Sequence, residues 1–151
     1  MPRMPADASA LLFRHPARSV RRSALRAYLA DLAGRIGGGR SVTCLISTDR
    51  ELRGLNRKFR GKDRATDVLS FPEILPQGSL GEIAISLDRA AAQAAAAGHT
   101  LEEELRILML HGMLHLAGLD HETDRGEMAR TETRWRKRLG LPAGLIERVA
   151  T

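Results

Sequence analysis

Three of the five histidines fall within eleven residues, at a spacing that can bring their rings together. His111 and His115 are four residues apart in an apolar helical segment, so both imidazoles project from one helix face. Gly118 can end that helix in a left-handed conformation and turn the chain back, which lets His121 reach the same point. Three neutral imidazoles that converge and leave a fourth position open are the ligand set of a catalytic zinc ion. The sequence therefore predicts one Zn²⁺ per chain on these histidines, whereas His15 and His99 are interpreted as structural or surface residues.

The residue after the first of these histidines indicates which bond the metal would help to break. The spacing and the glycine match the H-E-x-x-H-x-x-G-x-x-H pattern of metzincin proteases, but Gly112 stands where those proteases have Glu. That Glu takes a proton from the zinc-bound water and passes it to the leaving amine. A zinc-bound water, with a pKa near about 7, can also attack a phosphodiester, whose alkoxide leaving group a cation can stabilise. The pattern predicts a metallohydrolase, and the missing Glu favours a nucleic-acid substrate.

The distribution of charge also favours a polyanionic partner. The chain of 151 residues has 24 Lys and Arg against 18 Asp and Glu, and residues 1–72 hold 15 of the basic but only 6 of the acidic residues. The densest basic run covers residues 50–64. Within it we expect Arg57, Lys58 and Lys62 to bind phosphates of the substrate. A solvated helix face is the alternative interpretation of the same run.

Composition limits the class of protein. With 43% hydrophobic and 28% charged residues, residues 1–151 are expected to form a single globular domain. Aromatic residues make up only 3%, which argues against a stacking platform for bases of the kind that single-strand binders use. Cys44 is the single cysteine, which excludes an internal disulfide and a Cys-rich zinc site. The N-terminus lacks the apolar core of a signal peptide and no apolar run can span a bilayer, so we expect a cytoplasmic protein with no membrane contact.

The elements that must position the histidines follow an α+β pattern. Apolar periodicity and turn residues predict about four strands, over residues 10–14, 41–47, 67–71 and 82–86. About five helices are expected, over residues 20–36, 48–59, 90–97, 100–118 and 123–139, with capping boxes at Thr48 with Glu51 and at Thr100 with Glu103. Strands and helices neither alternate strictly nor segregate. This predicts an α+β fold with a small mixed sheet and the three-histidine site on a central helix and the following loop.

Two long motifs resemble the YbeY endoribonuclease family of bacterial rRNA maturation factors. The segment HGMLHLAGLDHE (residues 111–122) is similar to the family's H-G-x-L-H-L-x-G-Y-D-H signature. The segment LNRKFRGKDRATDVLSFP (residues 55–72) is similar to its N-x-x-x-R-x-K-D-x-x-T-D-V-L-S-F-P signature. LGEI (residues 80–83) resembles the family's L-G-[DE]-I strand, and Glu132 fits the helix after the third histidine. Leu119 departs from the family's usual tyrosine, which removes a hydroxyl but no ligand.

The resemblance implies a metal-dependent endoribonuclease that is specific for single strands. It implies action in ribosome quality control and in rRNA processing, at the 3′ end of the small-subunit RNA, with the small subunit as partner. It also implies zinc on the three histidines and Arg60 as the essential basic residue beside the metal. The residues support Arg60 independently, because it follows an apolar-faced helix in the most basic run and its guanidinium can offset charge on a phosphate.

Three points stay open at the level of sequence. Asp120 could orient a histidine as a carboxylate behind the ligands, or could cap a helix. A zinc peptidase with metzincin-like spacing is one alternative function, although Gly112 and the basic half weigh against it. A non-catalytic ribosome assembly factor is the other, because three histidines can also hold a structural metal at a helix–loop junction.

Overall fold

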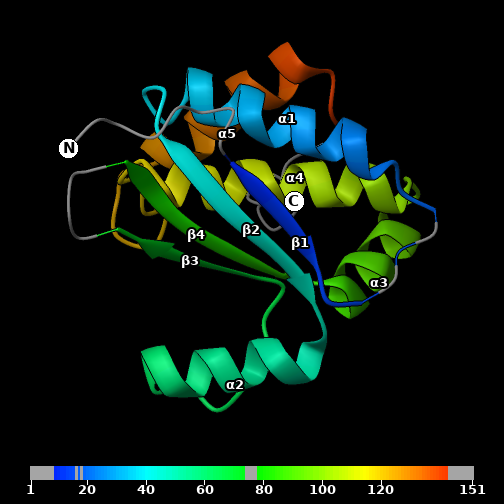
Figure 1. Ribbon diagram of the computed structural model, residues 1–151. Helices are drawn as coiled ribbons and strands as arrows, with labels where there is room; N and C mark the ends of the chain where they lie inside the picture. Colours follow the sequence, from blue (N-terminus) through cyan, green and yellow to red (C-terminus); the bar gives the residue numbers. More distant parts are fainter. Residues whose placement is uncertain (1–8, 16, 18, 74–77, 143–151) are drawn as a thin grey trace.

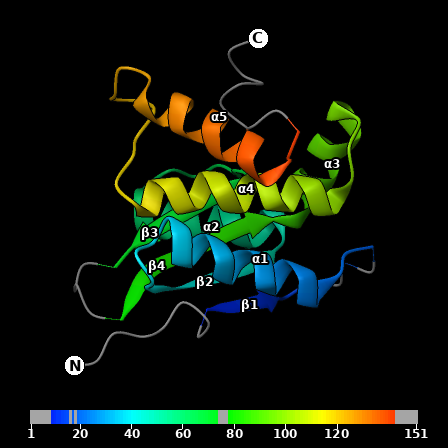
Figure 2. The same cartoon turned by 90° about the horizontal axis from the view of Figure 1, so that it is seen from above.

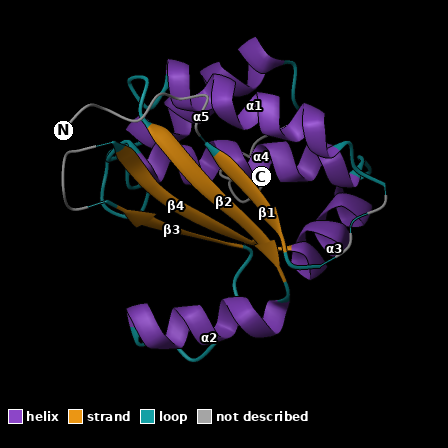
Figure 3. Ribbon diagram, in the orientation of Figure 1, coloured by secondary structure: helices purple, strands orange, loops and turns teal. Residues whose placement is uncertain are grey.

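A four-stranded mixed sheet lies at the centre of the fold (Figures 1 and 3). The computed structural model describes residues 9–15, 17, 19–73 and 78–142. In the order β1-β2-β4-β3, the strands β1 (Ala10–Phe13), β2 (Ser41–Ser47) and β4 (Ser79–Ser86) are parallel. The edge strand β3 (Val68–Pro72) is antiparallel to β4. The predicted four-stranded mixed sheet is confirmed.

Helices cover both faces of this sheet, and the described part of the chain has five of them, as predicted. They are α1 (Arg22–Arg35), α2 (Asp49–Arg60), α3 (Leu87–Ala97), α4 (Leu101–Leu116) and α5 (Glu127–Leu139). On one face α4 lies beside α1, and α5 packs on α4 from the outer side (Figures 1 and 2). On the other face α2 packs its Leu52 against Leu69 and Ala84 of the sheet. The α+β fold class is confirmed.

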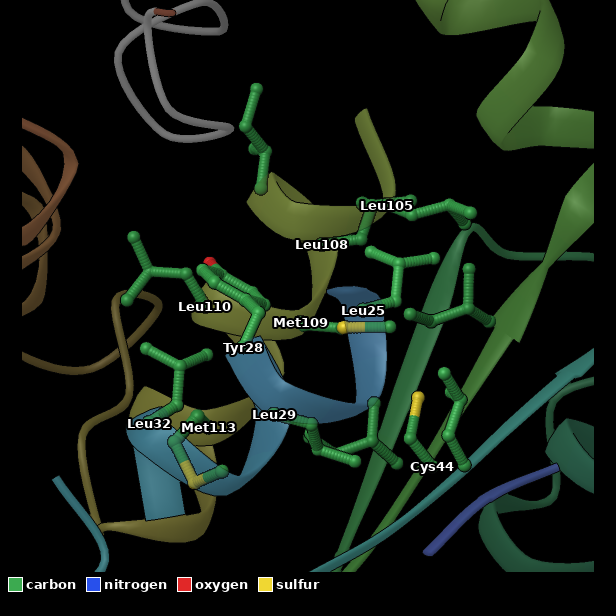
Figure 4. Packing of buried hydrophobic residues seen from close by; sticks show 14 of the residues in the cluster. Leu25, Tyr28, Leu29, Leu32, Cys44, Leu105, Leu108, Met109, Leu110 and Met113 are labelled. Atoms are coloured by element: carbon green, nitrogen blue, oxygen red, sulfur yellow. The ribbon is translucent and has the colours of Figure 1, made fainter. Parts of the chain in front are cut away.

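The α4 helix is the centre of the main core. Eleven of its sixteen residues are buried, which explains why the segment is apolar all round rather than on one face. Met109 and Met113 belong to the same buried cluster as Leu25 and Leu29 of α1 and Cys44 of β2 (Figure 4). Burial raises the pKa of the Cys44 thiol to about 12, so this free cysteine stays protonated and inert. None of the described helices combines the length and apolar character that crossing a membrane requires.

Threonine side chains begin α2 and α4, but only one of the two predicted capping boxes is complete. Thr100 Oγ1 accepts a hydrogen bond from the Glu103 N–H at 3.1 Å, and Glu103 Oε1 accepts one from the Thr100 N–H at 2.9 Å. Thr48 Oγ1 likewise accepts from the Glu51 N–H at 3.2 Å. The Glu51 carboxylate, however, accepts from the Arg14 guanidinium at 2.8 Å and from the Ser47 hydroxyl at 2.5 Å, so both of its oxygens bind other groups. The return half of that box was predicted wrongly.

The last helix begins later than its sequence pattern indicates. α5 starts at Glu127, four residues after the predicted start at residue 123. The Asp124 carboxylate accepts hydrogen bonds from the N–H groups of Gly126 at 2.9 Å and Met128 at 2.8 Å. Gly126 adopts a left-handed φ of 93°, so the chain forms turns up to that residue and becomes helical only after it. The prediction was wrong because Asp124 satisfies the backbone N–H groups at the start of α5 from outside the helix.

Candidate metal centre

The three predicted histidines lie together at the end of α4 and in the turn that follows it. Ring nitrogens of His111, His115 and His121 all lie within 4.8 Å of one another. The ring centroids of His111 and His115 are 4.8 Å apart, and that of His121 lies 5.3 Å and 5.4 Å from them. Three nitrogen ligands at these distances could hold one metal ion.

The backbone at the end of α4 brings the third histidine back to the other two. The helix ends at Leu116, and Gly118 then adopts a left-handed φ of 101°, which a glycine reaches without steric penalty. The Gly118 N–H donates to the His115 carbonyl at 3.0 Å, and the Leu119 N–H donates to the Leu114 carbonyl at 3.1 Å. These bonds close the helix and reverse the chain, as the position of the glycine predicted.

A buried carboxylate orients the first histidine. The His111 ring is buried, and its Nδ1 lies 2.8 Å from Oε2 of Glu132, which is fully buried on α5. With Nδ1–H donated to this carboxylate, Nε2 is the nitrogen left to face a metal. Carboxylates behind metal-binding histidines fix the tautomer and raise the basicity of the ligand nitrogen. Residues on two helices, 21 positions apart, therefore build this part of the site.

The environment of the second histidine favours its neutral form. Burial is the main cause that lowers the pKa of the half-buried His115, and the nearby imidazoles of His111 and His121 lower it further. A protonated ring cannot bind a metal, so a lowered pKa keeps His115 in the ligand form.

The histidines line a cavity of about 690 Å³ that Arg60 also lines. Arg60 is the last residue of α2, and residues of the edge strand β3 line the same cavity. The other residues that line the cavity are Thr66, Asp67, Val68, Ser70, Pro72, Gln93, Gly118, Leu119, Asp120 and Glu122. The structure thus places the predicted arginine and the predicted ligands around one space.

The other predicted basic residues lie outside that cavity. Arg57 and Lys58 are exposed on the last turn of α2, and Lys62 is exposed just after it. Of the described basic residues, Arg60 is the one that lines the cavity. A contact of the other three with substrate would therefore occur along α2, and it stays a prediction.

Gly112 is explained by packing rather than by chemistry. A Cβ at this position would lie 3.0 Å from Cγ2 of Ile83 and 3.2 Å from Oγ of Ser70. The Ser70 hydroxyl also donates a hydrogen bond to the Gly112 carbonyl at 3.1 Å. Position 112 therefore faces the sheet at close range and has no room for the Glu of a metzincin.

Comparison with known proteins settles the family. The sequence profile described as Endoribonuclease YbeY matches residues 16–140. The chain belongs to the YbeY family. A curated protein named Endoribonuclease YbeY from Solibacter usitatus is 54% identical over 143 residues, which cover 95% of this chain and 96% of that protein. One with the same name from Helicobacter pylori is 41% identical over 121 residues, which cover 80% and 86% of the two chains.

A solved structure has the same fold. The solution structure of TM1509 from Thermotoga maritima superposes with a TM-score of 0.61 at 30% identity, covering 87% of this chain and 89% of that one. The two segments that resemble the YbeY signatures, residues 55–72 and 111–122, supply every described lining residue of the cavity except Gln93. The family resemblance is therefore concentrated at the candidate site.

The sequence left Asp120 open between orienting a histidine and capping a helix, and the structure shows another carboxylate, Glu132, in hydrogen-bond contact with His111. Asp120 Oδ1 accepts from the Glu122 N–H at 3.1 Å, and its carbonyl accepts from the N–H of Asp124 at 3.1 Å. These bonds order the turn that carries His121, and a direct role of Asp120 toward a histidine stays a prediction. Glu132 was matched only as part of a helix, and its contact depends on how α5 packs on α4. One clue to the role of Glu132 was present in the sequence: it lies four residues after the apolar Met128, on the helix face that must be buried.

Proposed function

We propose that this YbeY-family protein is a zinc-dependent endoribonuclease that cleaves single-stranded RNA. The observation that carries the proposal is the shared cavity, in which His111, His115 and His121 lie with Arg60. The curated relatives named Endoribonuclease YbeY support RNA as the substrate. Three imidazole nitrogens with one position left open fit Zn²⁺ and its catalytic use.

In this proposal the histidines hold the metal and Arg60 holds the phosphate. A zinc ion held by these three imidazoles would supply Lewis acidity and would lower the pKa of a bound water to about 7. Hydrolysis forms a bond from a water oxygen to phosphorus and breaks the bond to the leaving ribose oxygen; the water gives up one proton to the solvent and the leaving oxygen takes one up. The Arg60 guanidinium can bind two phosphate oxygens and offset the negative charge that increases on them. Glu132 keeps the His111 ring in its productive tautomer.

In this proposal the exposed cations along α2 bind the RNA strand next to the cleavage site. We place phosphates that flank the scissile bond on Arg57, Lys58 and Lys62, because these side chains are exposed and follow the helix that ends at Arg60. The biological substrate proposed is the 3′ end of the small-subunit rRNA, with a further role in ribosome quality control in the cytoplasm. The small ribosomal subunit is then the partner that presents the RNA.

The test combines metal analysis with RNA cleavage. We expect about one zinc ion per chain. Cleavage should be faster for single-stranded than for duplex RNA, stop with a chelator and return when Zn²⁺ is added. His115→Ala should lose metal and cleavage while His15→Ala, which changes an exposed histidine outside the cluster, keeps both.

Each of the other outcomes has a definite meaning. If a variant in which all three histidines are replaced by alanine still bound about one metal ion per chain, the assignment of the histidines as metal ligands would be wrong. Metal binding without RNA cleavage would favour the assembly factor with a structural metal. Hydrolysis of an unfolded protein substrate, with no cleavage of RNA, would favour the peptidase.

A further inference from the structure

An exposed aromatic ring lies beside the arginine of the candidate site. Phe59 precedes Arg60 on α2 and is 59% exposed. Among the described residues, Leu12 is the other large apolar residue that is exposed, at 50%, and it lies on β1 at the opposite edge of the sheet. Single exposed apolar residues are common, so exposure alone assigns no role to Phe59.

The position of the Phe59 ring is fixed by a second ring. Phe71 of β3 contacts it edge-on, with centroids 5.6 Å apart and planes inclined by 66°. Phe71 is itself half-buried against the cluster of Leu52, Leu69 and Ala84. A ring held in this way loses little conformational entropy when a planar ligand stacks on it.

The two rings do not line the cavity of the histidines, but their neighbours along the chain do. Side chains alternate across a strand, so Phe71 points toward α2 while its neighbour Ser70 points to the opposite face and bonds to Gly112 of α4. Ser70 and Pro72, on either side of Phe71, line the cavity, as does Arg60. A strand of RNA with a phosphate at Arg60 is therefore close to the exposed ring of the preceding residue, Phe59.

The surroundings of the ring are cationic. The Lys58 Nζ lies 5.2 Å from the ring centroid, and Arg57 and Lys62 are exposed nearby along the chain. An aromatic ring among cations binds single-stranded nucleic acid, because bases stack on the ring while phosphates bind the charges. A protein partner would need a larger contiguous apolar patch than one ring among charges.

We propose that Phe59 is a positioning residue on which one base of the single-stranded RNA stacks, next to the phosphate at Arg60. This inference rests on the proposed function. The low aromatic content argued against a stacking platform, but composition counts rings and does not show where they are exposed. One supported ring beside Arg60 is sufficient to hold one base.

The test measures cleavage of a short single-stranded RNA by the zinc-loaded protein. Base stacking on an aromatic residue contributes about 1–3 kcal/mol, so Phe59→Ala should raise KM between about 5-fold and about 160-fold with a much smaller change in kcat. Phe59→Trp should restore the wild-type KM. Phe59→Leu keeps an apolar contact with Phe71, so it should unfold near the wild-type temperature and still show the raised KM. Leu12→Ala is the matched control and should leave KM unchanged.

A series of RNAs, each with one base removed, identifies the stacked position. Removing one particular base should raise KM for the wild type and have no further effect on Phe59→Ala. A wild type that cleaves RNA normally, with Phe59→Ala and Phe59→Leu both at the wild-type KM, overturns this inference and leaves the proposed function standing. A wild type that does not cleave RNA overturns both.

Discussion

Nδ1 of His111 and Oε2 of Glu132 lie 2.8 Å apart, with both side chains buried. This contact joins α4 to α5 and fixes which nitrogen of His111 faces the cavity. Glu132 thereby affects the candidate metal centre without lining the cavity itself.

Glu132→Gln should weaken zinc binding by about 10- to 100-fold, because the amide keeps the volume of the side chain but loses the charge that raises the basicity of His111. Competition with a chromophoric chelator measures the affinity. Glu127→Gln removes an exposed carboxylate from the same helix and should bind zinc as the wild type does. Equal zinc affinity for Glu132→Gln and the wild type would show that the hydrogen bond is only structural.

The histidine cluster could be predicted from sequence because its geometry is local. His111 and His115 share a helix face by periodicity alone, and Gly118 marks the reversal that returns His121. Glu132 could not be assigned in the same way, since its contact depends on the packing of α5 against α4. The start of α5 was missed for a related reason: periodicity indicates which residues can be helical, whereas Asp124 decides where the helix begins.

Gly112→Glu tests whether the site could act as a metzincin. The new side chain would meet Ile83 and Ser70, so we expect a loss of several kcal/mol of unfolding free energy, because it both overpacks the core and buries a carboxylate. Thermal unfolding measures the change. Gly54→Ala, at a helical position with open space around its Cβ, should instead stabilise the protein by about 0.5–1 kcal/mol. A stable Gly112→Glu protein with peptidase activity would contradict the packing argument.

The contact between Glu102 and Arg21 should make stability depend on pH. The Arg21 side chain donates to Glu102 and lowers the pKa of that carboxyl from 4.5 to about 2. Because folding lowers this pKa, the ionised carboxylate stabilises the fold above about pH 4.5, and this contribution is lost as the pH falls toward about 2. Glu102→Gln should therefore lower Tm near neutral pH and have a smaller effect at about pH 3. A difference in Tm that is the same at both pH values would contradict this.

The affinity for single-stranded RNA should fall as salt increases, because the cations along α2 release counterions when they bind phosphates. Each such contact contributes about 0.7 to the slope of log affinity against log salt concentration, so Arg57→Ala should reduce the slope by about that amount. Arg26→Ala removes the same charge from an exposed position on α1, on the other face of the sheet, and should leave the slope unchanged. Equal slopes for all three proteins would mean that α2 presents only a solvated face.

Arg60 should act on the transition state rather than on the metal or the fold. It is exposed at the end of α2, and a guanidinium has no free lone pair for zinc. Arg60→Glu should therefore reduce RNA cleavage by at least about 10²–10³-fold, since it removes a cation that stabilises the developing charge. Arg60→Lys should restore only part of the rate, because an ammonium cannot bind two phosphate oxygens in a planar fork. Zinc content and thermal unfolding of both variants should stay near the wild type. Loss of zinc from Arg60→Glu, or RNA cleavage by Arg60→Glu at the wild-type rate, would show that this role is wrong.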